Sequence, residues 1–482
     1  MLQKFIKRVF GHKSAAESTD APKAKPKAKP RGKPKAAKIY TKAEHGVGRD
    51  RLSRGALQTV DGLAKAGYQA YVVGGAVRDL LLGLPPKDFD VATDATPEQV
   101  HAAFRRSRLI GRRFRIVHVL FGAETVEVST FRTADLSDAE TDEHGRVLRD
   151  NTFGGIEDDA TRRDFTINAL YYDAANETVI DYHGGVGDLR KKVLRIIGDA
   201  ETRYREDPVR MLRVARFAAK LGFSIDPKTR AAIPAVAPLL SNVPSSRLFD
   251  EMMKLLLSGH AVAAVKQLRG EGLHHGLLPM LDVILEQPMG EKFVMLALAR
   301  TDERILQGKG VAPGFLFAAL LWHEVLKTWN EMKSRGDHSM PALFEAMNVV
   351  LDTQTEQLAI QRKFVADMRE MWSLQPRFEK MNGRAPFKLL EHPRFRAAYD
   401  FMLLRAESGE IEMAVGEWWT SFYDADAQTR NDLSSGAPTG TAEPKKRRRR
   451  RRSPDKDGNT GDGNAVAGDT GGHDAAGDPP GR

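Results

Sequence analysis

The most constraining feature of the chain is the stretch GGAVRDLLLGLPPKDFD at residues 74–90, in which two glycines and an arginine precede two aspartates. Asp88 and Asp90 are separated by one apolar residue, and the side chains of residues i and i+2 point to the same side of a β-strand. The two carboxylates can therefore share metal ions. Because Mg²⁺ is held in proteins by one or two carboxylates together with phosphate oxygens, this spacing predicts a two-metal site for a magnesium nucleotide.

The residues before the aspartates suit a phosphate group. The strand-like segment YQAYVVGGAV at 68–77 contains Gly74 and Gly75, whose backbone N–H groups can approach a phosphate more closely than those of residues with side chains. Arg78 follows at a spacing that suits bidentate pairing with a phosphate. Alone, two aspartates after a proline pair would be solvated loop residues. The combination of strand, glycine pair, arginine and carboxylates instead favours a nucleotide site.

Three sequence blocks together point to a known family. They are GGAVRDLLLGLPPKDFDVATDATPE at 74–98, RRDFTINALYYD at 162–173 and EDPVRMLRVARFAAKLGF at 206–223. In this order they resemble the class II nucleotidyltransferases, which comprise bacterial poly(A) polymerases and CCA-adding tRNA nucleotidyltransferases. With the strands that join them, the blocks cover about residues 55–260. A P-loop is excluded because the chain contains no GxxxxGK(S/T) motif.

Two residues compete for the place of a third carboxylate. Glu127 belongs to ETVEVSTFR at 124–132, a period-2 strand that could lie beside the strand of Asp90. Asp164, in RRDFTIN, occupies a position that the resemblance implies is catalytic, although an aspartate there could also cap a helix that starts in TINAL. We expect Asp164 to matter to the site without contacting the metal, and Arg163 beside it to meet the nucleotide.

The third block predicts a helix that begins at Asp207 and ends at Gly222, with apolar residues at helical spacing. Arg210, Arg213 and Arg216 follow one another at three-residue intervals and form a cationic arc on another part of its surface. Without other information, such arginines would form an ordinary solvated face.

The resemblance implies that this helix reads the incoming base. In the family, the EDxxR element, here Glu206, Asp207 and Arg210, contacts the edge of the base in place of a template, and the arginines that correspond to Arg213 and Arg216 contact the nucleotide. A carboxylate accepts from an exocyclic amine, and a guanidinium donates to ring nitrogens or carbonyls. Such a pocket rejects a base that leaves its polar groups unpaired.

The net charge of +10 is concentrated in two segments. PKAKPKAKPRGKPKAAK at 22–38 holds eight basic residues and no acid, and KKRRRRRR at 445–452 holds eight more, so the rest of the chain carries a charge of −6. Neither segment can offset its ordering entropy by burying an apolar face, and we expect both to be disordered. For a protein that acts on RNA we favour phosphate binding by counterion release over a role in solubility alone.

Residues 2–10 carry five apolar residues at helical spacing among basic ones. A short basic amphipathic helix of this kind can lie on an anionic membrane surface or dock on a partner, and a frayed terminus is the alternative. No stretch approaches the ~18 continuous apolar residues of a membrane span, and no secretory signal is visible. The chain contains no cysteine, which excludes disulfides and thiolate metal sites. We therefore expect a cytoplasmic protein.

Hydrophobic periodicity predicts an α+β fold with several parts, and the family resemblance implies the same. The polar stretch 133–160 is expected to be a mobile excursion over the site. The predicted parts are a basic, mostly disordered N-terminal segment at 1–45, an α/β nucleotidyltransferase catalytic head at 46–185, a helical neck with the base-reading helix at 186–265, an RNA-binding helical body at 266–430 and a disordered Arg-rich tail at 431–482.

The motifs and the resemblance together predict template-independent polyadenylation of RNA 3′ ends. AMP would be transferred from ATP with release of pyrophosphate, while Asp88 and Asp90 hold two Mg²⁺ ions. Gly74, Gly75 and Arg78 would cradle the phosphates. RNA 3′ ends and ATP are the expected partners, and the RNA-degradation machinery is a candidate one.

Poly(A) polymerases and CCA-adding enzymes share all three blocks, so the choice between them depends on LIGRRFRIVHV at 109–119. This stretch resembles one that marks bacterial poly(A) polymerases; by itself it would be an amphipathic strand with its arginines toward solvent. The polyarginine tail also fits a polymerase that holds varied RNA ends, whereas a tRNA-specific enzyme needs shape recognition. We favour poly(A) polymerase, with CCA addition as the alternative.

Two hypotheses from other classes are disfavoured. An RNA-binding scaffold without activity would have lost a metal aspartate or the glycine pair, and both are present. A phosphohydrolase in the C-terminal half would need clustered metal-binding His-Asp pairs. His274, His275 and His323 have no adjacent aspartate in that arrangement, which favours core or surface histidines.

Overall fold

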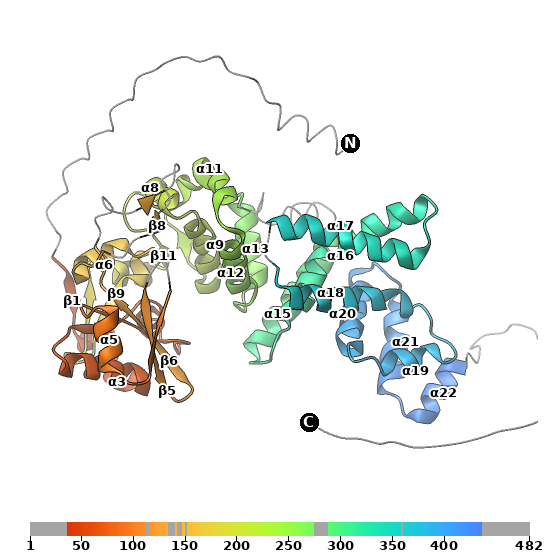
Figure 1. Ribbon diagram of the computed structural model, residues 1–482, viewed down its shortest axis with the longest axis horizontal. Helices are drawn as coiled ribbons and strands as arrows, with labels where there is room; N and C mark the ends of the chain where they lie inside the picture. The colour runs from red at the N-terminus through yellow and green to blue at the C-terminus, as the bar shows by residue number, and fades with distance from the viewer. Residues whose placement is uncertain are drawn as a thin grey trace, which may run out of the picture.

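The computed structural model describes residues 36–111, 115–133, 140–141, 147–149, 152–273, 288–357 and 360–435. The N-terminal amphipathic stretch, the arginine tail, His274, His275 and part of the predicted excursion at 133–160 lie outside these ranges. The described chain forms a sheet-containing head at one end, followed by helices that extend to the other end (Figure 1). The predicted α+β class, a mixed-sheet head followed by helices, is confirmed, but the neck is not all-helical because it also contains a pair of short parallel strands, β11 (Val193–Leu194) and β12 (Ser224–Ile225).

The head is built on an eight-stranded mixed sheet with the strand order β1-β10-β9-β2-β3-β6-β5-β4. β3 and β6 are parallel, and all other neighbours in this sheet are antiparallel. Its strands are β1 (Lys38–Tyr40), β2 (Ala70–Val73), β3 (Asp90–Thr93), β4 (Ser107–Ile110), β5 (Ile116–Phe121), β6 (Glu124–Thr130), β9 (Leu170–Asp173) and β10 (Thr178–Asp181).

The head begins earlier in the chain than residue 46. β1 pairs with β10 at the edge of the sheet, with Ile39 opposite Ile180, and the helix α2 (Lys42–His45) follows it. The side chain of Tyr40 is buried. Three residues of β-strand hydrogen bonding therefore draw the end of the basic N-terminal segment into the fold.

The helix α3 (Arg54–Lys65) packs on β2, β3 and β6. The Ser53 side chain accepts a hydrogen bond from the Ala56 N–H at its start, and the chain turns at Gly67 with φ +89°. The further elements of the head are η1 (Arg49–Arg51), α3 (Arg54–Lys65), α4 (Gly75–Leu81), α5 (Pro97–Ala103), β7 (Glu140–Thr141), β8 (Val147–Arg149), α6 (Ile156–Arg162), η2 (Thr166–Asn168) and α7 (Gly185–Lys191).

The neck contains the predicted base-reading helix as α9 (Val209–Leu221), which ends at Gly222 with φ +64°. Pro208 occupies its N-cap, and Asp207 closes the preceding helix instead of capping α9; one oxygen of its carboxylate accepts from Arg247. The other neck elements are β11 (Val193–Leu194), α8 (Ala200–Glu206), β12 (Ser224–Ile225), α10 (Pro227–Ala231), α11 (Ile233–Val236), η3 (Ala237–Asn242), α12 (Ser245–Leu256) and α13 (Ala261–Gly270).

The part of the body that the structure describes is all-helical, as predicted, and one apolar core runs from the head through the neck into it. A second core surrounds the buried Trp419 near its C-terminal end. Within the part of the chain that the structure describes, no helix combines the length and apolar character needed to cross a bilayer. The body helices are α15 (Pro288–Leu306), α16 (Pro313–Ser334), α17 (Ser339–Gln357), α18 (Arg362–Leu374), η4 (Gln375–Arg377), α19 (Ala385–Leu390), α20 (Phe395–Ser408), α21 (Met413–Asp424) and α22 (Ala427–Ser435).

Candidate active site

A cleft of about 690 Å³ between the head and the neck collects residues from all three sequence blocks. Of the predicted site residues, Glu127 and Glu206 do not line it. The predicted residues in the lining are Gly74, Gly75, Arg78, Asp88, Asp90, Arg163, Asp164, Asp207, Arg210, Arg213 and Arg216.

The head side of the cleft holds a cluster of negative charge. Asp90 begins β3, and the parallel pairing of β3 with β6 places Glu127 directly beside it. Desolvation in the cleft and the negative charges of Glu127 and Asp88 raise the pKa of Asp90 to about 6, against the opposing effect of Arg163. The nearby positive charge thus only partly compensates the carboxylates, which suits them to a bound cation.

Two carboxylates are too few to enclose a metal ion. Among the described residues, no group of three or more His, Asp and Glu side chains lies close enough to hold one. A hard cation at Asp88 and Asp90 would therefore take its other ligands from water and phosphate oxygens, which is the usual environment of Mg²⁺ beside a nucleotide.

The turn from β2 into α4 keeps the cleft open beside Asp90. Gly74 adopts φ +77° and ψ −130°, which disfavours a residue with a side chain. A Cβ atom at this position would lie 3.6 Å from Arg163 Nη1 and 3.9 Å from Asp90 Oδ2. Glycine therefore leaves the space between a cation and a carboxylate free for a ligand.

Arg78, predicted to meet a phosphate, is already hydrogen bonded inside the protein. Its guanidinium is buried, forms an ion pair with Asp79 at 2.7 Å and donates to Asn168 Oδ1 at 2.7 Å. It also lies over the Phe217 ring, with Cζ 5.1 Å from the ring centroid. The bidentate phosphate contact stays a prediction, and in this structure Arg78 joins the head to the neck.

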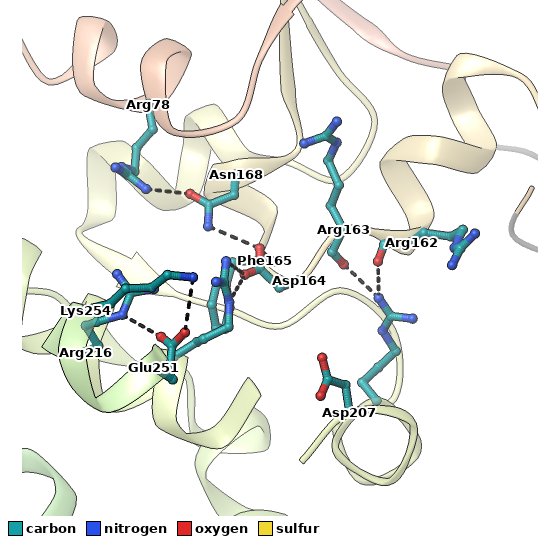
Figure 2. Close-up of polar contacts among 12 residues, drawn as sticks. Arg78, Arg162, Arg163, Asp164, Phe165, Asn168, Asp207, Arg216, Glu251 and Lys254 are labelled. Carbon is teal, nitrogen blue, oxygen red and sulfur yellow. Dashed lines mark hydrogen bonds and ion pairs between the residues drawn. The ribbon is translucent and has the colours of Figure 1, made fainter. Parts of the chain in front are cut away.

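Both carboxylate oxygens of Asp164 are engaged (Figure 2). One accepts from the Phe165 N–H and from Asn168 Nδ2, and the other accepts from Arg213 Nε at 2.8 Å and Nη2 at 2.6 Å. Burial raises the pKa of Asp164, but the charge of Arg213 and these hydrogen bonds outweigh burial and lower the pKa to about 2. In this arrangement Asp164 holds the neck helix α9 against the head and has no oxygen free for a metal.

The guanidinium group of Arg163 is held by hydrogen bonds on one edge, and its other edge can contact a ligand. Its Nε and Nη2 donate to Asp159 Oδ2 at 3.1 and 2.9 Å, and Nε also donates to the Tyr171 hydroxyl. Its Nη1 faces Gly74. This geometry is compatible with the predicted nucleotide contact.

The neck side carries the residues that were predicted to read a base. Arg210 donates to Glu206 Oε2 at 3.0 Å and to the Arg203 carbonyl at 2.7 Å, which fixes its guanidinium. Arg247 Nη2 donates to Asp207 Oδ2 at 3.0 Å. Asp207 Oδ1 and Arg247 Nη1 are buried and have no hydrogen-bond partner. An acceptor and a donor are thus left unpaired on two residues that line the cleft.

One wall of the cleft, formed by α12, was not predicted from the sequence. Its residues in the lining, Arg247, Asp250, Glu251 and Lys254, occur at i, i+3, i+4 and i+7, the spacing of one helix face. Figure 2 shows Glu251 between Arg216 and Lys254. The spacing was visible in the sequence, but charged residues on one face of an amphipathic helix usually face solvent.

Comparisons with known proteins agree with this geometry. Three family models match: "Poly A polymerase head domain" at residues 70–195, "Probable RNA and SrmB- binding site of polymerase A" at 222–285 and "Polymerase A arginine-rich C-terminus" at 335–453. Poly(A) polymerase I of Escherichia coli O6:H1 (strain CFT073) is 46% identical over 398 residues, which cover 80% of this chain and 85% of that protein.

The CCA-adding enzyme of Geobacillus thermodenitrificans is 42% identical over 218 residues, which cover 45% of this chain and 53% of that enzyme. The solved structure of the Thermotoga maritima CCA-adding enzyme complexed with tRNA shares the fold, with a TM-score of 0.52 at 18% identity over 84% of this chain and 91% of that one.

The head, the cleft and the matching family models define the class: this is a nucleotidyltransferase of class II. The similarity to the CCA-adding relative covers less than half of the chain, whereas the similarity to poly(A) polymerase I covers 80% of it. The chain belongs to the poly(A) polymerase I family.

Proposed function

We infer that the protein is a polynucleotide adenylyltransferase, which transfers AMP from ATP to RNA 3′ ends without a template and releases pyrophosphate. The observation that carries this inference is a single cleft that contains both the carboxylates Asp88 and Asp90 and the base-reading residues Asp207 and Arg210, in a chain 46% identical to a poly(A) polymerase I. The 3′-hydroxyl, the triphosphate and the base would all be held in this cleft.

We propose that Asp88 and Asp90 bind Mg²⁺, because their negative charge is only partly compensated and opens onto the cleft. When bound, the metal would lower the pKa of the 3′-hydroxyl and neutralise the leaving pyrophosphate. Gly74 and Gly75 leave space for the phosphates, and Arg163 Nη1 brings a positive charge to the same space. Glu127, beside Asp90 in the sheet, adds negative charge to the site.

The unpaired atoms of Asp207 and Arg247 suggest which bases the cleft accepts. A buried polar atom without a partner costs free energy. An adenine edge presents an amino donor next to a ring-nitrogen acceptor and would satisfy both atoms; cytosine shares this pattern, whereas guanine and uracil present the reverse. Both atoms are covered in this structure, so base binding requires a small side-chain shift. We propose that this pair rejects guanine and uracil, and that the size of the cleft separates adenine from cytosine.

The assay that tests the function supplies each nucleoside triphosphate separately, with Mg²⁺, to a generic single-stranded RNA and to a tRNA that lacks its 3′ end. We expect ATP alone to give long, heterogeneous extensions of the generic RNA, CTP to give little, and GTP and UTP to give none. Addition that stops after three nucleotides, needs both CTP and ATP and occurs only on the tRNA would establish the CCA-adding alternative.

Deleting residues 445–452 should weaken RNA binding and flatten its dependence on salt, while the affinity for ATP stays unchanged. The segment carries eight basic residues, and the slope of log K against log salt falls in proportion to the phosphates that are neutralised. The measurement is RNA affinity at several salt concentrations, for the full chain and for the deletion. An unchanged slope would assign the arginines to solubility or to another partner.

We propose that the parts of the chain divide this work: the head binds metal and phosphates, the neck at 186–265 reads the base and the body at 266–430 guides RNA. RNA 3′ ends and ATP are then its partners, and the cytoplasm is the compartment that we propose for the reaction. The RNA-degradation machinery, and a membrane surface for residues 2–10, stay predictions from the sequence.

A further inference from the structure

One cation of the cleft lining differs from all the others. Each arginine of the lining forms an ion pair of 3.0 Å or less with a carboxylate. Lys254 has a much weaker pairing, because its Nζ lies 3.9 Å from Glu251 Oε2, and Glu251 already accepts from Arg216 at 2.7 Å. The arginine pairs are Arg78–Asp79, Arg163–Asp159, Arg210–Glu206, Arg213–Asp164, Arg216–Glu251 and Arg247–Asp207.

Lys254 is also the most accessible of these cations. Its side chain is 60% exposed, whereas the six arginine side chains are between 4% and 32% exposed. The arginines are therefore held in place by partners inside the protein, and their charges are largely compensated. Lys254 presents a flexible and nearly uncompensated charge, which suits an anionic ligand that slides through the site.

The position of Lys254 favours the RNA strand over the triphosphate as this ligand. Lys254 belongs to α12, and the cleft residues from the segment 222–285, which matches the family model of a probable RNA-binding site, all come from this helix. The carboxylates and glycines that we assign to the triphosphate lie on the head, across the cleft. An RNA 3′-hydroxyl that reaches Asp88 and Asp90 must bring its last phosphates into the same cleft.

We propose that Lys254 binds a backbone phosphate of the RNA strand close to its 3′ end. The inference rests on the proposed function and identifies one contact between the protein and its RNA substrate. Asp250 provides an internal test, because it lies one helical turn before Lys254 on the same stripe, with Cβ atoms of such pairs about 6 Å apart. Asp250 is exposed and forms no ion pair with the residues that the structure describes. Its charge repels a strand that passes Lys254.

The experiment compares the full chain with Lys254→Ala, Lys254→Arg and Asp250→Asn, using single-stranded RNA as the probe. Lys254→Ala should raise the KM for RNA and the Kd measured without nucleotide on the order of fivefold, and should reduce the salt slope of RNA binding by about 0.7, the value for one single-strand phosphate. The KM for ATP should not change. Lys254→Arg should retain most of the affinity, and Asp250→Asn should lower the KM for RNA.

Lys65→Ala is the matched control, because Lys65 is an exposed lysine at the end of the head helix α3, outside the segment 222–285, and does not line the cleft. It should leave RNA binding and the salt slope unchanged. A rise in the KM for ATP with an unchanged KM for RNA would assign Lys254 to the triphosphate and overturn the proposal, as would no effect on either constant. Because the Kd needs no catalysis, it tests Lys254 even if the wild-type chain fails to extend RNA with ATP, a failure that would refute the proposed function alone.

Discussion

Replacing Asp90 by asparagine should abolish nucleotide addition and at the same time raise the melting temperature of the protein. The loss of activity, by a factor on the order of 10³ or more, is expected because the replacement removes a ligand of the proposed two-metal site. The gain in stability follows from the raised pKa of Asp90, about 6, because the ionised carboxylate is unfavourable in the folded protein. Residual turnover above a few per cent of the wild-type value would contradict the two-metal assignment.

The pH dependence of this effect has a definite sign. The folded pKa of Asp90 is raised above its ordinary value of 3.8, so its contribution to wild-type stability is fully present below that value and is lost as the pH rises through 6. The melting temperature of Asp90→Asn should therefore exceed that of the wild type most clearly above pH 6, and the difference should shrink toward pH 4. Thermal unfolding across this range is the measurement. A difference that does not change with pH would assign the stabilisation to another cause.

Replacing Asp164 by alanine should destabilise the protein by about 3 kcal/mol, because it leaves Arg213 largely buried without its partner. Activity should fall as well, since Asp164 and Arg213 join the head to the neck helix α9. Denaturant unfolding at neutral pH measures the loss of stability. Equal stability of Asp164→Ala and the wild type would show that the ion pair does not hold the two parts together.

A double replacement distinguishes the cost of an unpaired charge on Arg213 from other effects of removing the Asp164 side chain. The double variant Asp164→Ala, Arg213→Leu should regain part of the lost stability, because no unpaired charge is left. In the wild type, the folded pKa of Asp164 is lowered to about 2 from 3.8. Its contribution to stability is therefore present above pH 3.8 and is lost as the pH falls through 2. The double variant should lack this part of the acid dependence.

Much of the head could be predicted from the sequence, because its strands and turns depend on residues that are close together in the chain. The apolar pattern predicted the strands that the structure has as β2 and β6, and Gly222 marked the end of α9. The eleven predicted residues that line the cleft belong to three short blocks of sequence. The N-terminal limit of the head was not predictable, because β1 is three residues long and exists only through its pairing with β10.

The sequence by itself indicated the reaction class, through the spacing of Asp88 and Asp90 and the glycines before them, because an i, i+2 carboxylate pair on an extended backbone can share a metal ion. In the structure β3 begins at Asp90, so Asp88 lies just before the strand and not on it. Only the tertiary structure decided how each charge is used. The carboxylate of Asp164 is paired with Arg213 and is not left for a metal ion. The helix α12 forms a wall of the cleft, although its charged residues have the spacing of a solvent-exposed helix face. The physical reason is that the pairing of a charge and its access to solvent depend on residues far away in the chain. The partner of Asp164 is 49 residues distant, and that of Asp207 is 40 residues distant.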